Sequence, residues 1–159
     1  MGKKQAGFSL IELLIVVAII LIIAAIAIPN LLRSRMAANE ASAVGSLRTI
    51  NTAEVTFATT YPAQGFAPNI GALGGAAPCV NALVTAACLI DDVLSTTAKK
   101  SGYSFTAVGA GALPMVQYTS TALPTIIGQS GQRAFCSDQS GVIRYNGGGA
   151  ACAGGDPAL

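Results

Sequence analysis

Apolar residues are concentrated in one stretch near the start of the chain. Residues 13–28 form a run of 16 consecutive apolar residues, and between Phe8 and Ile28 only Ser9 and Glu12 are polar. A helix over the 21 residues from Phe8 to Ile28 would be roughly 32 Å long, close to the roughly 30 Å hydrocarbon core of a bilayer. The pattern therefore predicts a helix that can cross a membrane.

After Pro29 the helical pattern continues but becomes amphipathic. Apolar residues recur roughly every three or four positions, which keeps one helix face apolar, and they are Val44, Leu47, Ile50, Phe57 and Tyr61. The charged residues of this part lie among Ala-rich stretches, at Arg33, Arg35, Glu40 and Arg48. We expect the helix to end near Thr60 and its apolar face to pack on a head domain. Pro29 has no amide hydrogen, so it should kink or locally open the helix.

The second half of the chain has the pattern of short strands separated by turns. Runs at 103–108, 115–119, 133–136 and 142–145 read as strands, and residues 138–141 as the turn of a hairpin. The Gly- and Ala-rich tail after residue 145 has little reason to order by itself. The predicted fold class is α+β, with a long N-terminal helix packed on a small antiparallel sheet of about four strands.

Composition excludes several functional classes. Only 10% of the residues are charged and the formal net charge is +2, so the chain lacks the field that holds a nucleic-acid backbone. The absence of histidine removes imidazole catalysis and most zinc sites. Asp91 and Asp92 could begin a calcium site, but no EF-hand spacing follows, and the start of a helix or a solvated face is the favoured interpretation. We expect no enzymatic activity, no cofactor and no metal.

The start of the chain allows three interpretations of the apolar segment. Lys3 and Lys4 precede it, so the N-terminus should stay cytoplasmic and the rest should cross the membrane. A secretory signal cleaved after the sequence Ala-Ile-Ala at 25–27 is one interpretation, but the apolar run is longer than usual for such a signal. A plain single-span anchor is another, and it leaves the costly carboxylate of Glu12 unexplained.

The third interpretation rests on the sequence Gly-Phe-Ser-Leu-Ile-Glu-Leu-Leu at residues 7–14. After a short basic leader and before an apolar helix, it closely resembles the type IV pilins and pseudopilins with short leaders. The resemblance implies cleavage between Gly7 and Phe8 by a prepilin peptidase, N-methylation of Phe8, and retention of the helix. It divides the chain into a leader (1–7), a transmembrane and filament-core helix (8–29) and an extracytoplasmic head (30–159).

Glu12 gains a role from this resemblance. Cleavage creates an ammonium group on Phe8, four residues before Glu12 and on the same face if both are helical. The two charges could pair within one subunit, or between subunits, where they would set the register of stacked helices because an unpaired buried charge is costly. The resemblance favours the pairing between subunits during assembly. Pilins of this family also commonly have a proline like Pro29, where the helix can be stretched in the filament.

The resemblance also implies a function, a set of partners and a location. The chain would be the structural subunit of a type IV pilus, made of identical subunits, serving adhesion, motility or DNA uptake. Its other partners would be the prepilin peptidase and methyltransferase, the assembly machinery of the inner membrane, and membrane lipid before assembly. It would be a single-pass protein of the bacterial inner membrane until it enters a surface pilus. The alternatives are the major pseudopilin of a type II secretion system and a membrane-anchored binding module.

Four cysteines in an extracytoplasmic chain indicate disulfides rather than metal binding. Three pairings are possible. Pairing of neighbours costs the least rearrangement and favours Cys79 with Cys88 and Cys136 with Cys152. A bridge near the C-terminus also resembles the cysteine-bounded loop of many pilins. It argues against the secretion pseudopilins, which usually order this region with calcium.

Overall fold

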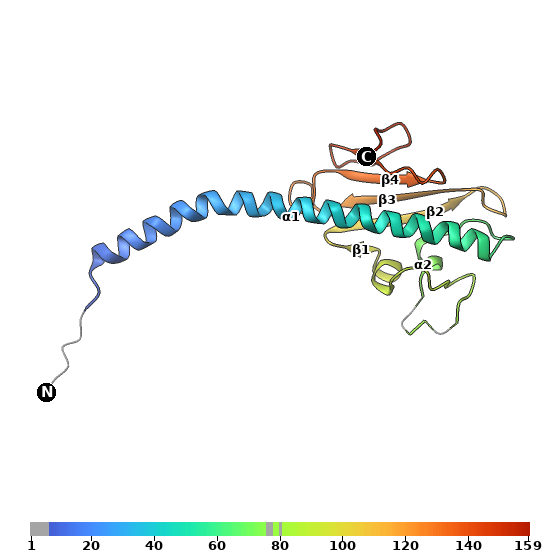
Figure 1. Ribbon diagram of the computed structural model, residues 1–159, viewed down its shortest axis with the longest axis horizontal. Coiled ribbons are helices and arrows are strands. Elements are labelled where there is room, and N and C mark those ends of the chain that lie inside the picture. The colour runs from blue at the N-terminus through green and yellow to red at the C-terminus, as the bar shows by residue number, and fades with distance from the viewer. Residues whose placement is uncertain (1–6, 76–77, 80) are drawn as a thin grey trace. The chain divides into compact units, whose positions relative to one another are not determined.

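The computed structural model describes residues 7–75, 78–79 and 81–159 of the chain (Figure 1). Residues 1–6 of the predicted leader, including Lys3 and Lys4, and residues 76–77 and 80 lie outside the described residues. The chain divides into two compact units, of which the first ends at Arg35 and the second is Met36–Leu159. Each is described by itself.

The helix α1 (Leu10–Thr60) is the longest element and runs without interruption through Pro29. Its end agrees with the predicted end near Thr60. Because proline has no amide hydrogen, the carbonyl of Ala25 lacks its helical partner, but the helix is not broken there. Alanines at 24, 25 and 27 and leucines at 31 and 32 flank Pro29, and both residue types have high helix propensity, which favours the continuity.

The second unit is built on an antiparallel sheet of five strands in the order β1-β2-β3-β4-β5. The strands are β1 (Lys99–Lys100), β2 (Tyr103–Ala110), β3 (Gln117–Pro124), β4 (Ala134–Asp138) and β5 (Arg144–Asn146). A short helix α2 (Ile70–Leu73) and a π-helical turn η1 (Val93–Thr97) precede the sheet. The α+β class is confirmed, with one strand more than predicted, because the two-residue β1 is too short to give a sequence pattern.

The core of this unit lies between α1 and one face of the sheet (Figure 1). The predicted apolar face of α1 is buried, with Leu47, Ile50 and Phe57 fully so, while Tyr61 is half-buried. Alternation along β2 turns Tyr103 and two further residues inward, as the two-residue period of a strand requires. The prediction that this face packs on a head domain is confirmed.

A polar cluster sets the register between the helix and the sheet. Asn51 of α1 donates a hydrogen bond from its side-chain amide to the Ser137 hydroxyl at 2.8 Å. The buried Ser120 hydroxyl donates to the Asn51 side-chain oxygen at 3.3 Å. Buried polar groups that are bonded in this way favour one arrangement over its neighbours, because a shifted helix would leave them unsatisfied.

The C-terminal tail is ordered, contrary to the expectation from its composition. Ala158 pairs with Arg144 of β5. The Tyr145 amide donates to the Pro157 carbonyl at 3.0 Å, and the Leu159 amide donates to the Ile143 carbonyl at 2.9 Å. The tail therefore acts as an added strand that covers the open edge of β5, which is how a sheet edge is protected.

Candidate functional site

The N-terminus of α1 carries one of the two hydrogen bonds of a capping box, the bond from the Ser9 amide to the Glu12 side chain. Ser9 stands just before the helix, and its carbonyl accepts hydrogen bonds from the amides of Glu12 at 3.1 Å and Leu13 at 3.3 Å. The Ser9 amide in turn donates to the Glu12 Oε2 atom at 3.0 Å. The sequence Ser-x-x-Glu is typical of this cap, and a carboxylate in the first turn also compensates the positive end of the helix dipole. Glu12 therefore has a local structural role that the sequence analysis missed.

Phe8 lies outside the helix in this structure. Because α1 begins at Leu10, Phe8 and Glu12 are not placed one turn apart on a helix face, as the spacing of four residues had suggested. Both Gly7 and Phe8 are exposed, and a Cβ added to Gly7 would meet nothing within 4 Å. The Gly7–Phe8 peptide bond is thus in accessible, non-helical chain.

The apolar part of α1 is not covered by any of the residues that the structure describes. Its large side chains from Leu10 to Ile28 are between 45% and 79% exposed. This is the one described helix that is long and apolar enough to cross a membrane. Water is a poor environment for such a surface, so it calls for an apolar cover that the described part of the chain does not supply.

No cluster of metal-ligating side chains is present among the described residues. No group of three or more Cys, Asp or Glu side chains converges there. Asp91 accepts the Leu94 amide at 2.7 Å and pairs with Lys100 at 2.6 Å. The hydrogen bond from Lys100 is the main reason why the pKa of Asp91 lies below 3.8. Asp91 therefore caps a helical turn, in agreement with the interpretation favoured over calcium.

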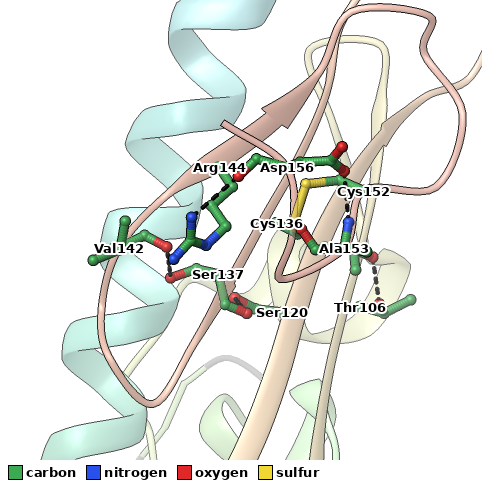
Figure 2. Close-up of a disulfide and its surroundings, with 10 residues drawn as sticks. Thr106, Ser120, Cys136, Ser137, Val142, Arg144, Cys152, Ala153 and Asp156 are labelled. Atoms are coloured by element: carbon green, nitrogen blue, oxygen red, sulfur yellow. Dashed lines mark hydrogen bonds between the residues drawn. A yellow bond between two sulfur atoms is a disulfide. The ribbon is translucent and has the colours of Figure 1, made fainter. Parts of the chain in front are cut away.

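Two disulfides join neighbouring cysteines, Cys79 with Cys88 and Cys136 with Cys152. The second links β4 to the C-terminal tail, as Figure 2 shows. Beside it, Arg144 donates from Nη1 to the Asp156 carbonyl at 3.1 Å, and Asp156 Oδ2 accepts the Ala153 amide at 2.8 Å. Together these contacts hold the tail against the sheet.

Glu40 is the first of two buried carboxylates that the sequence analysis did not single out. Its Oε1 atom accepts the amides of Gln132 at 2.9 Å and Arg133 at 3.0 Å, and its Oε2 atom accepts Arg133 Nε at 2.8 Å. Burial alone would raise the pKa of Glu40, but these bonds outweigh it and hold the pKa below 4.5. Glu40 thus ties α1 to the segment that leads into β4.

Glu54 is the second buried carboxylate and is fully inaccessible. Its Oε2 atom accepts the Ala67 amide at 2.8 Å, while Oε1 has no hydrogen-bond partner among the described residues. Burial raises the pKa of Glu54 to about 7, and the Ala67 bond opposes the shift only in part. The signal was available in the sequence, because Glu40 and Glu54 share the three-to-four-residue spacing of Val44, Leu47 and Phe57.

Comparison with known proteins bears on the N-terminal part of the chain. A family model for the prokaryotic N-terminal methylation motif matches residues 2–28. The chain is 45% identical over 56 residues to the type IV major pilin protein PilA of Myxococcus xanthus, which is 35% of this chain and 26% of that protein. It is 68% identical over 38 residues to the type IV wide pilus major component PilA4 of Thermus thermophilus, which is 24% of this chain and 29% of that protein.

These matches cover less than a third of either curated relative. No solved structure matches the chain. The comparisons therefore describe the N-terminal part of the chain, and the head is described by its fold alone. The methylation motif at residues 2–28 and the two relatives show that the N-terminal part of the chain, from which the long helix continues, is similar to that of type IV pilins.

Proposed function

We propose that this protein is the structural subunit of a type IV pilus and that it polymerises through the apolar part of α1. The observation that carries the proposal is the uncovered apolar segment, whose large side chains are 45–79% exposed, continuous with a folded and disulfide-bonded head. Such a surface needs a partner along its whole length. Lipid would cover it before assembly, and the same segment of other subunits would cover it in a filament. The role is structural, and we assign no enzymatic activity.

Processing would take place at the Gly7–Phe8 bond. A prepilin peptidase would cut there on the cytoplasmic side and leave a methylated amine on Phe8, and the exposed, non-helical chain at this bond suits such a cut. Mass spectrometry of purified filaments should find a chain that begins at Phe8 with one added methyl group. A chain that begins at Ile28, as a conventional signal peptide would leave, would contradict the proposal.

Glu12 would act in assembly by receiving the Phe8 ammonium of an incoming subunit. In the uncleaved chain its carboxylate already accepts the Ser9 amide, so it points back toward the end where the new ammonium would form. In an apolar filament core, either charge without the other would be strongly unfavourable. The contact would therefore fix the axial register of neighbouring helices.

Two substitutions test this role. Glu12→Val should leave a processed subunit in the membrane, because removal of a carboxylate eases membrane insertion. It should form few filaments, because the Phe8 ammonium of an incoming subunit loses its partner. Glu12→Gln keeps the cap acceptor but loses the charge, so it should assemble nearly as poorly if charge pairing is the requirement. The measurement compares sheared surface protein with membrane-fraction protein for each variant. Normal filament yield from Glu12→Val would contradict the assembly role.

Pro29 and the remaining parts of the chain fit the same proposal. Since Pro29 leaves one helical carbonyl unpaired, the helix could stretch there when subunits pack. The domains would be the leader (1–7), the membrane and filament-core helix (8–29) and the extracytoplasmic head (30–159). The partners would be identical subunits, the peptidase and methyltransferase, the assembly machinery and inner-membrane lipid. Electron microscopy of surface filaments from a deletion strain separates a pilus from a short secretion pseudopilus or a plain membrane-anchored module.

A further inference from the structure

The surface of the head contains a groove with two arginines in its lining. We define the arginine groove as the hollow of about 310 Å³ that is lined by Arg48 and Glu40 of α1, by Arg133, and by apolar residues such as Val44. All of its lining residues belong to the second compact unit. The side chains of the groove carry two positive charges and one negative charge, so an acidic group can enter it favourably.

The guanidinium group of Arg133 is held in a fixed orientation. Its Nε atom donates to Glu40 at 2.8 Å, and its Cζ atom lies 5.4 Å from the centre of the Phe135 ring and 5.6 Å from the centre of the Tyr145 ring. The outer nitrogens Nη1 and Nη2 form no hydrogen bond with another described residue, and the side chain is 41% exposed. A fixed guanidinium edge with free donors suits a carboxylate, which can accept two parallel bonds.

Arg48 supplies a second positive charge that is not used within the chain. It is exposed and forms no ion pair with another described residue. Glu40 does not neutralise it, because the two oxygens of Glu40 already accept bonds from Arg133 and from two backbone amides. The arginine groove therefore has one cation without a counter-charge.

One acidic side chain of the head is without a partner among the described residues. Asp92 lies just before η1, is exposed, and forms neither a capping hydrogen bond nor an ion pair there. Val93, which follows it, is 53% exposed. We define the acidic knob as Asp92 and Val93. The other carboxylates of the head each accept a hydrogen bond, and they are Glu40, Glu54, Asp91, Asp138 and Asp156.

The turn η1 holds the acidic knob in place from behind. Leu94 is buried, and its amide donates to Asp91 Oδ1 at 2.7 Å. The Asp92 carbonyl accepts the hydroxyl groups of Ser95 at 3.1 Å and Thr96 at 2.6 Å. The backbone of the knob is thus fixed on both sides, and a carboxylate and an apolar side chain project together from an anchored turn.

The acidic knob and the arginine groove lie toward opposite edges of the sheet. Asp91, next to the knob, pairs with Lys100 of the edge strand β1. Arg133 precedes β4, which is the neighbour of the other edge strand, β5. Figure 1 shows β1 and β4 on opposite sides of α1. A surface that complements a different surface of the next copy can repeat without closing, and this is the contact that a filament needs.

We propose that the acidic knob of one subunit docks in the arginine groove of a neighbouring subunit, with the Asp92 carboxylate bound by Arg133 and Arg48 and with Val93 against the apolar lining. The inference rests on the proposed function, because it needs identical heads side by side in a filament. It commits to a second copy because the unpaired acid complements the unpaired cation and because the two surfaces lie toward opposite edges. The contact would fix the register of neighbouring heads.

Reversal of one charge at a time tests the contact in cells that express the full chain. Arg48→Asp and Asp92→Arg each place like charges together at every knob and groove. We expect each variant to yield about tenfold less sheared surface protein than the parent, or lower still, with unchanged protein in the membrane fraction. Lys99→Asp is the matched control, because it makes the same change of charge at an exposed residue outside the knob and the groove, and it should keep the parent yield.

Co-expression of Arg48→Asp with Asp92→Arg decides whether the pairing is between chains. The groove of each variant then complements the knob of the other, so mixed filaments that contain both chains should return toward the parent yield, with both chains identified by mass spectrometry. Recovery only when both changes are in the same chain would assign the pair to one chain and overturn the contact. Loss of filaments in Arg48→Asp alone would assign the groove to a different partner and overturn it too, and so would normal yield from both single variants.

The parent chain in the same experiment separates this inference from the proposed function. If the parent forms surface filaments and the co-expressed variants do not, the proposed function stands and the contact between knob and groove is wrong. If the parent forms no filaments, both the proposed function and the contact that rests on it are overturned.

Discussion

Replacement of Glu54 by Gln should remove most of the pH dependence of head stability between about pH 5 and pH 8. The carboxyl group is fully buried, one of its oxygens accepts the Ala67 amide, and the other has no partner among the described residues. Its ionised form is therefore poorly stabilised. Desolvation raises the pKa of Glu54 from its ordinary value of 4.5 to about 7 in the folded chain.

The sign and size of the effect follow from this shift. Between pH 4.5 and about 7 the folded chain binds a proton at Glu54 that the unfolded chain has released. The resulting stability is fully present below the unfolded pKa and is lost as the pH rises through the folded pKa. Since one pKa unit corresponds to about 1.4 kcal/mol, the contribution is about 3 kcal/mol.

Few other groups of the head interfere in this range. The chain has no histidine, the pKa values of Glu40, Asp91 and Asp138 are lowered below their ordinary values, and burial raises the pKa of the neighbouring Tyr118 to about 12. A decrease in the free energy of unfolding between about pH 5 and pH 8 can therefore be assigned to Glu54.

The assay is urea unfolding of the full chain in a non-ionic detergent at a series of pH values, followed by near-ultraviolet circular dichroism of the tyrosines. The parent chain should lose about 3 kcal/mol from the acid to the alkaline end, and Glu54→Gln should give a nearly flat profile. Glu40→Gln is the control, because it alters the other buried carboxylate and should keep the slope. If the slope survives in Glu54→Gln, the assignment of the elevated pKa to this carboxyl is wrong.

Three further predictions concern the head, each measured by urea unfolding of the full chain. Glu40→Ala should destabilise by about 2–4 kcal/mol because it leaves two backbone amides without their acceptor, whereas Arg133→Met should cost about 1 kcal/mol or less; equal losses would contradict this account. Joint replacement of Cys136 and Cys152 by Ser should lower the free energy of unfolding by about 3 kcal/mol and speed amide hydrogen exchange in residues 146–159. Joint replacement of Cys79 and Cys88, which close a shorter loop, should cost about 0.5 kcal/mol less. Unchanged exchange in the tail would show that its strand pairing suffices. Ala98→Gly should stabilise the head by about 1 kcal/mol because Ala98 has a positive φ of 51°. Ala107→Gly in β2 is the control and should destabilise it. A loss of stability at both positions would refute the backbone argument.

The amino-acid sequence determined the parts of this protein that depend on local pattern. The apolar run, the motif around Gly7 and Glu12 and the end of α1 near Thr60 could be predicted, because helix length and periodicity are properties of contiguous residues. The apolar face that packs on the head followed from the same periodicity. Local spacing also favoured the two cysteine pairs that the structure forms.

Only the tertiary structure decided the charge states of the buried carboxylates and how the tail is held. Glu40 and Glu54 lie on the core face of α1, but their charge states depend on amides at 132–133 and at Ala67, which the fold brings to them from elsewhere in the chain. Likewise, the tail is ordered by the edge of β5 and the bond to Cys136, although its own composition favours no structure. The physical reason is the same in both cases: a hydrogen bond between distant segments has no signature in the local sequence of either one.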